Sequence, residues 1–500
     1  MRHISKIFLI FTLFVSKVSS QNKLPNIVII YADDMGFGDL ACQNPDSKIL
    51  TPNLDLLAKQ GMRFTDAHSS SGVCSPSRYS LLTGRYHWRG HLKKGIVSEW
   101  GDPAIEENRM TIASMLKEKG YTTACIGKWH LGMEWPFKQG IGQKSTNKTV
   151  WKNRHKANIE SFDWTKPIER GPVAVGFDYY FGDGTINFPP YTWIENDKVL
   201  EIPTEILNLA GKFTAEGNWE CRKGPAAKNW DISSVPIVLT SKSVEYIKRQ
   251  KRTKKPFFLY FALPSPHAPI VPVKQFQGIS KAGGYGDYME QTDWMVGQVL
   301  TALKENNLDE DTLVIFTSDN GPEKYAYNRI KNYGHKSMGN FRGLKRDLWE
   351  GGHRVPFIVK YPGVVPASTI NKSLISQVDI FSTVAGIVGF EKPKNTGEDG
   401  LNFIENWKGL HKEPIRNSVV LHSLKGKFAI RKNNWLLIEN KTGAVTKVPK
   451  WLSELTKDNQ NTTPRVLYNL EKDPKELNNL FNEKPGIVKE LQSLLNSIRN

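Results

Sequence analysis

Cysteine is scarce in this sequence, and so are long apolar segments. Only four cysteines occur among the 500 residues, too few for a disulfide scaffold in a chain of this length. Beyond residue 20 no segment is apolar enough to cross a membrane, and there is no internal repeat or low-complexity tract. These absences exclude a disulfide-rich scaffold, an integral membrane protein and a repeat array. They leave a globular chain, either one large domain with a smaller one or three ordinary domains. The pairing of the cysteines cannot be deduced from sequence; they are Cys42, Cys74, Cys125 and Cys221.

The first 20 residues differ in character from the rest. Two basic residues precede the apolar run 7–15, and the small side chains of Val18 and Ser20 suit cleavage after residue 20. This pattern predicts a secretory signal peptide at 1–20, and its apolar run is too short to span a bilayer. We therefore expect an exported protein, periplasmic or secreted, without a membrane anchor.

Acidic residues are fewer than basic ones. The 68 Lys and Arg against 50 Asp and Glu give a formal charge of +18, which favours a polyanionic partner. For an exported chain we expect an acidic polysaccharide, not nucleic acid or a membrane surface. The densest basic run, KRQKRTKK at 248–255, separates a helical pattern from an apolar one and is typical of a solvated helix end.

The apolar pattern predicts an α/β fold. Stretches such as 53–61, 111–120 and 285–307 repeat apolar residues at helical spacing. They alternate with short apolar runs that predict buried strands, so we expect a mostly parallel sheet sandwiched by helices, with ligands bound beyond the carboxyl ends of its strands. The predicted strands are NIVIIYA at 26–32, TTACIGKW at 122–129, PFFLYFAL at 256–263, TLVIFTS at 312–318 and VPFIVKY at 355–361.

Composition divides the chain further. Between about 140 and 235 it is polar and rich in Gly and Trp, which predicts long loops over one face of the sheet, where binding functions are common. Beyond about 390 the runs VVLH, KFAIRKNNWLLIE and RVLYNLE predict antiparallel strands, and IVKELQSLLNSI predicts a closing helix. We expect a large α/β domain at 21–390 and a small α+β subdomain at 391–500.

Polar oxygen ligands follow two of the predicted strands. Asp33 and Asp34 end the first, and Asp319 and Asn320 end the fourth. Adjacent carboxylates repel one another unless a cation or hydrogen bonds compensate them. Four hard oxygens without cysteine and with few histidines favour Ca²⁺ or Mg²⁺ over zinc. The alternative for each stretch alone is an Asp- and Gly-rich turn or a helix cap.

The stretch VCSPSRYSLLTGR at 73–85 predicts a helix with a cysteine at its N-terminal end. Ser75 suits the cap and Pro76 the first turn, so Cys74 would lie at the electropositive helix end. Arg78 would follow one turn later on the same face. An oxyanion at Cys74 would then contact free N–H groups and a guanidinium together. The alternative is a buried structural thiol.

Two histidines and two lysines could complete such a site. Alternation along the end of the predicted strand puts Lys128 and His130 on one side. His267 follows an apolar strand between prolines, and the Gly-rich loop 342–352 could bring Lys345 into the site. Taken singly, each histidine is more often an ordinary surface or core residue.

The motif of Cys74, Ser75, Pro76 and Arg78, followed by Leu-Thr-Gly-Arg at 82–85, resembles the signature of the type I sulfatases, whose cysteine is oxidised to Cα-formylglycine. The resemblance extends over residues 24–390, approximately, and it implies an alkaline phosphatase-like fold. The segment GGYGDYMEQTDWMVGQVL resembles the carbohydrate sulfatases, a group that includes galactosamine 6-sulfatases. The other matching segments, in sulfatase order, are YADDMGFGDL, TPNLDLLAKQGMRFTDAH, GYTTACIGKWHLG, SPHAPIVP, TSDNGP and GLKRDLWEGGHRVP.

By this resemblance, a calcium ion would bind to Asp33, Asp34, Asp319 and Asn320, and the aldehyde hydrate at position 74 would complete its shell. The resemblance also implies a formylglycine-generating maturation enzyme as a partner. The resemblance also implies that Arg78 holds the sulfuryl oxygens and that Lys128 and Lys345 screen the charge of the substrate. It implies acid/base work by His130 and contact with the leaving oxygen by His267 together with Lys345.

Three functions remain to be compared. The first is a sulfatase acting on a sulfated oligosaccharide or polysaccharide, with algal galactans or ulvan ahead of animal glycosaminoglycans. The second is a phosphoester or phosphonate hydrolase of the alkaline phosphatase superfamily, whose two-zinc members need a Ser or Thr nucleophile and more His ligands. The third is a non-catalytic polyanion-binding protein, which would not require Cys74, Arg78, Lys128 and His267 together.

Overall fold

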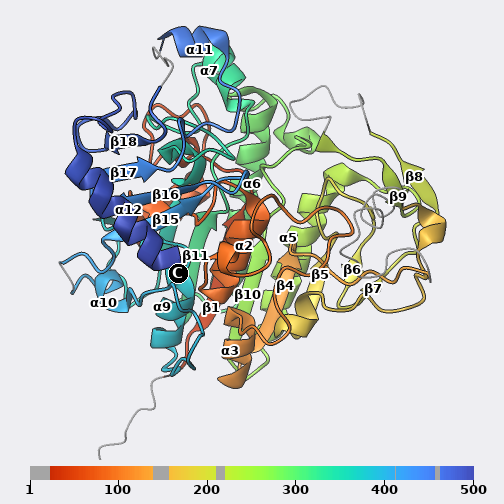
Figure 1. Cartoon of the computed structure of the whole chain (residues 1–500). Helices are drawn as coiled ribbons and strands as arrows, with labels where there is room; N and C mark the ends of the chain where they lie inside the picture. Colours follow the sequence, from red (N-terminus) through yellow and green to blue (C-terminus); the bar gives the residue numbers. More distant parts are fainter. Residues whose placement is uncertain (1–22, 139–156, 210–219, 411–412, 456–461, 500) are drawn as a thin grey trace, which may run out of the picture.

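The computed structural model describes residues 23–138, 157–209, 220–410, 413–455 and 462–499 (Figure 1). The predicted signal peptide at 1–20 lies outside these residues. In the described part of the chain, no helix combines the length and the apolarity needed to cross a bilayer. All four cysteines are free thiols.

A ten-stranded sheet forms the centre of the fold, in the order β13-β2-β12-β11-β1-β10-β4-β5-β6-β7. Its five middle strands are parallel, which confirms the mostly parallel sheet. The run predicted at 355–361 pairs antiparallel with β11, so the sheet is mixed towards its edges. The strands are β1 Asn26–Ala32, β2 Met62–Phe64, β4 Thr122–Gly127, β5 Tyr179–Gly182, β6 Ile194–Glu195, β7 Lys198–Val199, β10 Phe257–Ala262, β11 Thr312–Ser318, β12 Phe357–Lys360 and β13 Thr369–Asn371.

Helices cover both faces of the sheet. Successive side chains of a strand point to opposite faces, and because both sets are apolar here, each face must be covered. On β1, Ile27 and Ile29 contribute to one core and Val28 and Ile30 to the other, all fully buried. Burial of each such side chain contributes roughly 1.5–3 kcal/mol to folding. The helices of the first core are α2 Cys74–Thr83, α3 Ile112–Glu118 and α9 Asp379–Ile387, and those of the second are α1 Pro52–Gln60, α5 Val235–Gln250 and α6 Gly283–Glu305.

The C-terminal part forms a separate antiparallel sheet, as predicted. Its order is β15-β16-β17-β18, and it lies to one side of the large sheet, opposite β5–β9 (Figure 1). Leu491 and Leu495 of the closing helix pack against one face, and Trp349 of the large domain packs against the other. The elements are β15 Ser418–His422, β16 Phe428–Lys432, β17 Trp435–Ile438, β18 Val466–Asn469 and α12 Pro485–Arg499.

The remaining segments are short or irregular. Helix α5 ends at Gln250 and residues 251–255 are exposed, so the basic run is a solvated helix end, as predicted. The described parts of 140–235 hold small strands and loops, in line with the composition. Short elements not yet named are β3 Ala67–His68, β8 Glu205–Leu207, β9 Gly224–Ala226, α7 Ala326–Tyr333, α8 Glu350–His353, β14 Ile375–Ser376, α10 Ile404–Trp407 and α11 Lys450–Leu455.

Candidate active site

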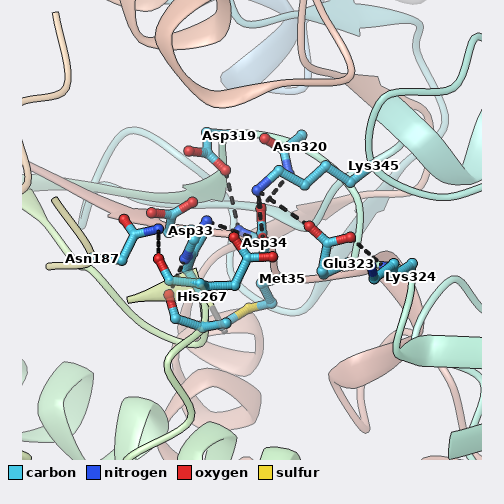
Figure 2. A network of polar contacts seen from close by, with 12 residues as sticks. Asp33, Asp34, Met35, Asn187, His267, Asp319, Asn320, Glu323, Lys324 and Lys345 are labelled. Atoms are coloured by element: carbon cyan, nitrogen blue, oxygen red, sulfur yellow. Dashed lines mark hydrogen bonds and ion pairs between the residues drawn. The ribbon is translucent and has the colours of Figure 1, made fainter. Parts of the chain in front are cut away.

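The carboxyl ends of β1 and β11 bring four polar side chains together (Figure 2). The backbone N–H of Asp34 donates to Oδ1 of Asp319 at 3.2 Å, and Nδ2 of Asn320 donates to Oδ1 of Asp34 at 2.7 Å. With Asp33, all four residues are at most 1% exposed. The predicted cluster therefore forms, because neighbouring parallel strands end at the same edge.

Helix α2 places Cys74 beside this cluster. Cys74 lies at the N-terminus of the helix, as predicted, and all ten residues of the helix are buried. Its cap is Val73, so the predicted cap at Ser75 was wrong. Ser75 is the second helical residue, and its hydroxyl instead accepts from the N–H of Val97 at 3.1 Å. The Cys74 sulfur and carboxylate oxygens of Asp33 and Asp319 all lie within 4.8 Å of one another.

Burial keeps the Cys74 side chain a neutral thiol. Desolvation raises its pKa above the usual value, and the nearby carboxylates of Asp33 and Asp319 add to this, against the opposing charges of Lys345 and Lys128. Because the thiolate is the reactive form of cysteine, the unmodified side chain is a poor nucleophile at neutral pH.

Arg78 lies one turn after Cys74 and contacts the same carboxylates. Its Nε and Nη2 donate to Oδ2 of Asp319 at 3.1 and 2.8 Å, and Nη2 is 3.5 Å from Oδ2 of Asp33. The guanidinium is fully buried. A buried arginine between two carboxylates is fixed in position and stays charged.

The end of β4 supplies Lys128, whose Nζ forms an ion pair with Oδ2 of Asp33. Gly127 precedes it with φ +113°, and a Cβ there would lie 2.0 Å from the carbonyl oxygen of Ala262. Only glycine fits this close approach of two strands. Burial alone would raise the pKa of Asp33, but Lys128, His267 and Arg78 together hold it well below its usual range.

His130 lies close to Lys128 but not by strand alternation. Strand β4 ends at Gly127, and His130 occupies a turn with φ +51°. Its Nε2 is 2.9 Å from the carbonyl oxygen of Val97. Burial, followed by the charges of Lys128 and Arg78, lowers the pKa of His130 well below its usual value, so the ring is neutral.

His267 and Lys345 approach the cluster from the side of Asp34 (Figure 2). Nε2 of His267 is 3.7 Å from Oδ2 of Asp34, and burial lowers the pKa of this histidine to about 4. Nζ of Lys345 lies 2.8 Å from the same carboxylate. Burial alone would lower the pKa of Lys345, but Asp34 holds it above the usual range.

Sequence reasoning missed the groups that position Lys345. Arg346 donates from Nη1 and Nη2 to the two carboxylate oxygens of Glu323 at 2.6 and 2.7 Å, and Glu323 in turn lies 3.9 Å from Nζ of Lys345. Thr446 donates to the carbonyl oxygen of Lys345 at 2.7 Å. Arg346 lies within the matching segment GLKRDLWEGGHRVP and Glu323 directly follows TSDNGP, which could have drawn attention to them; Thr446 carried no such signal.

The donor set fits a hard cation. Among the described residues, Oδ1 of Asp33 and Oδ1 of Asn320 are buried without a hydrogen-bond partner. Such oxygens are costly to bury unless something pairs with them. Burial and then the charge of Asp33 raise the pKa of Asp319, so a cation here would stabilise both carboxylates. With Asp34, these residues could hold Ca²⁺ or Mg²⁺.

Comparison with known proteins identifies the family of the chain. The Sulfatase family profile matches residues 25–390, and the profile "N-sulphoglucosamine sulphohydrolase, C-terminal" matches residues 339–500. The N-acetylgalactosamine-6-O-sulfatase of Bacteroides thetaiotaomicron is 32% identical over 97% of this chain and 95% of that protein. The N-acetylgalactosamine-6-sulfatase of Canis lupus familiaris is 31% identical over 82% of this chain and 73% of its own.

A solved structure is similar over nearly the whole chain. It comes from work on the metabolism of multiple glycosaminoglycans by Bacteroides thetaiotaomicron, and it superimposes with a TM-score of 0.79 at 31% identity, covering 95% of this chain and 99% of that one. The fold is thus the alkaline phosphatase-like fold of sulfatases. The chain belongs to the sulfatase family, and it is a sulfuric ester hydrolase.

Proposed function

We propose that this protein is a calcium-dependent sulfatase that uses a formylglycine made from Cys74 to release sulfate from a sulfated sugar. The observation that carries the proposal is the position of Cys74, at the start of a buried helix and close to Asp33, Asp319 and Arg78. A neutral thiol there serves no hydrolytic role by itself, whereas an aldehyde at this position would lie among ligands for a metal and for sulfate.

Asp33, Asp34, Asp319 and Asn320 would hold the calcium ion, together with the modified side chain at position 74. When bound, the ion would polarise the sulfate ester and lower the pKa of the attacking hydroxyl. Arg78 would stabilise the sulfuryl oxygens, because its guanidinium is buried and already fixed between Asp319 and Asp33.

A formylglycine hydrate at position 74 would supply one hydroxyl that attacks sulfur and a second whose deprotonation expels sulfate and restores the aldehyde. His130 is suited to take that proton, because its Nε2 is bound to the carbonyl oxygen of Val97 and its Nδ1 has no hydrogen-bond partner among the described residues. Lys128 would screen the charge of the sulfate. Lys345, with His267, would stabilise the leaving oxygen of the alcohol.

The substrate we propose is an oligosaccharide with a 6-O-sulfated galactose-type sugar, released by exo action. The relatives named N-acetylgalactosamine-6-sulfatase, the formal charge of +18 and the aromatic residues beside the site support it. Sulfated N-acetylgalactosamine is the first candidate. Sulfated sugars of algal galactans or ulvan are the alternative.

The proposed biology follows from the same residues. The protein is exported to the periplasm or the medium after loss of residues 1–20. A formylglycine-generating enzyme acts on Cys74 before folding. Residues 21–390 form the catalytic domain, and residues 391–500 form a subdomain that supports it.

Two measurements test the proposal. Mass spectrometry of the peptide that contains Cys74, from protein made in its native host, should show formylglycine; an unmodified thiol in active protein would reject the mechanism. A panel of defined sulfated sugars, scored for free sulfate, should show turnover. Turnover of p-nitrophenyl sulfate with none on any sugar would reject the carbohydrate substrate.

A further inference from the structure

A small recess adjoins the site on the side of His130. Its walls come from the loop 97–101, from the turn after β4 and from the segment 183–190 after β5. The free space in it is about 30 Å³, enough for one polar group the size of a water molecule but not for a sugar ring. A ring held at the site would therefore stay outside and extend one substituent into the recess.

Asp183 lies in the wall of this recess and is 2% exposed. Neither of its carboxylate oxygens has a hydrogen-bond partner in the part of the chain that the structure describes. Burial raises the pKa of Asp183 to about 7. Burial of a carboxyl group without a partner destabilises a fold, and packing gives no reason for this one. A ligand with a hydrogen-bond donor would supply the missing partner.

Aromatic side chains form much of the rest of the recess, and its other polar side chains are those of Ser98, Glu99, His130 and Thr185. Trp100 packs edge-on against Trp135 with ring centroids 5.1 Å apart, and Phe188 packs edge-on against His130 at 5.4 Å. The indole N–H of Trp129 is already used, because it donates to the carbonyl oxygen of Gly132 at 2.9 Å. Such walls suit the C–H face of a sugar. Of the two carboxylates in the wall, that of Glu99 is paired with Arg222, whereas that of Asp183 has no hydrogen-bond partner among the described residues.

His130 connects the recess to the reaction centre. It lines the recess, and it lies two residues after Lys128, which pairs with Asp33 of the carboxylate cluster. A substituent in the recess would therefore belong to the same sugar that carries the sulfate.

We propose that Asp183 determines specificity by binding a hydrogen-bond donor, a hydroxyl or an acetamido N–H, on the ring that carries the sulfate. This inference rests on the proposed sugar substrate. It adds a residue that contacts the sugar and does not act on the sulfate itself. An aryl sulfate has no such donor and gains nothing from Asp183.

The test compares Asp183→Ala and Asp183→Asn with the wild-type protein on three substrates: 6-sulfated N-acetylgalactosamine, 6-sulfated galactose and p-nitrophenyl sulfate. Loss of one buried hydrogen bond should lower kcat/KM for the sugars about 10- to 100-fold and leave p-nitrophenyl sulfate within about threefold. If the acetamido N–H is the ligand, N-acetylgalactosamine loses its advantage over galactose in the variants. If a hydroxyl is the ligand, both sugars fall alike.

Asp293→Asn is the matched control. Asp293 is 2% exposed on α6 and burial raises its pKa to about 6, but its carboxylate accepts from Asn53 and Leu54 away from the site. This variant should change stability and not the ratio of sugar to aryl turnover. Calorimetric binding of sulfate-free N-acetylgalactosamine and galactose gives a second readout that is independent of conversion at Cys74.

The outcomes separate the two proposals. Wild-type protein that releases sulfate from no sugar would reject the proposed substrate. Wild-type turnover of sugars with equal effects of Asp183→Ala on sugar and aryl substrates, or with no effect on either, would reject the role of Asp183 alone. Should Asp183→Ala fail to fold, Asp183→Asn, which keeps the shape of the side chain, answers the same question.

Discussion

Arg78 donates two hydrogen bonds to a single oxygen of Asp319, from Nε at 3.1 Å and from Nη2 at 2.8 Å, although the two residues are 241 positions apart. Both side chains are fully buried. The pair joins helix α2, which begins at Cys74, to the end of β11, so it fixes the cysteine relative to the carboxylate cluster.

Arg78→Lys should reduce kcat/KM at least about 100-fold, because lysine keeps the charge but cannot make both bonds. Steady-state kinetics and thermal unfolding would measure the two effects. The control is Arg89→Lys, which removes a similar pair with Asp399 outside the site. It should lower stability and leave the activity per folded molecule unchanged. Equal activity losses in the two variants would contradict the role of Arg78.

Cys74→Ser should give a folded protein without normal turnover. Serine fills the same space and can accept sulfate, but it has no second hydroxyl with which to expel it. Activity and circular dichroism would be measured together. Cys125→Ala, which alters another buried thiol on β4, should remain active. Full activity of Cys74→Ser would show that the thiol is structural and that the site lies elsewhere.

Asp319→Asn should lose both bound calcium and activity, since the variant removes a carboxylate from the proposed donor set. Metal analysis of the purified protein, before and after chelation, would check it. Asp379→Asn is the matched control, because Asp379 is also fully buried and paired with an arginine, Arg416. The calcium content of this variant should not change. Stoichiometric zinc in the wild-type protein would overturn the metal assignment.

The free energy of unfolding should fall as the pH drops from about 6.5 to about 4. Burial, followed by the charge of Arg499, lowers the pKa of His422 to about 4, whereas an unfolded histidine titrates near 6.5. Within this window the unfolded chain binds more protons, so the stabilisation is complete above it and lost below it, at most about 3 kcal/mol.

His422→Gln should flatten this part of the profile, measured by denaturant unfolding at several pH values. Nδ1 of His422, on β15, lies 3.0 Å from Nε2 of His87, which follows helix α2. The change in slope therefore reports on the contact between these two segments. The same substitution at the exposed residue His91 should leave the slope as it is. An unchanged slope in His422→Gln would assign the loss to other groups.

Thr446→Val should lower kcat about five- to tenfold with little change in KM. Its hydroxyl donates to the carbonyl oxygen of Lys345, and Oδ1 of Asp347 accepts from the N–H groups of Val445 and Thr446. The C-terminal region thus holds the loop of Lys345 by a few hydrogen bonds, each contributing about 1 kcal/mol. Thr442→Val, in the same segment, should have no effect on kcat.

The sequence was informative wherever one physical rule decided the outcome. Parallel strands end at one edge, and so Asp33 and Asp319 could be brought together without coordinates. The turn at His130 was harder, because β4 stops before it and the backbone reverses with positive φ. No local pattern foretold that Ser75 would bond to Val97 instead of capping its helix.

Contacts between distant segments account for the rest. The carboxyl of Asp183 is surrounded by residues from three loops, and the carbonyl oxygen of Lys345 is held by Thr446, about a hundred positions later. A single sequence carries no signal for such pairs, since the local sequence around each residue has no pattern that indicates a distant partner. These are the contacts on which the proposed role of Asp183 and the position of Lys345 depend.

The complete burial of helix α2 limits the time during which Cys74 can be modified. Cys74 is 1% exposed, and every residue of its helix is covered, so a second enzyme cannot reach the thiol once the chain has folded. On the proposed mechanism, oxidation of Cys74 and folding compete in each newly made molecule. Molecules that fold before Cys74 is oxidised are well folded but stay inactive. Two preparations of equal purity and equal melting temperature could therefore differ severalfold in activity. Slower folding, or more of the modifying enzyme, would raise the active fraction.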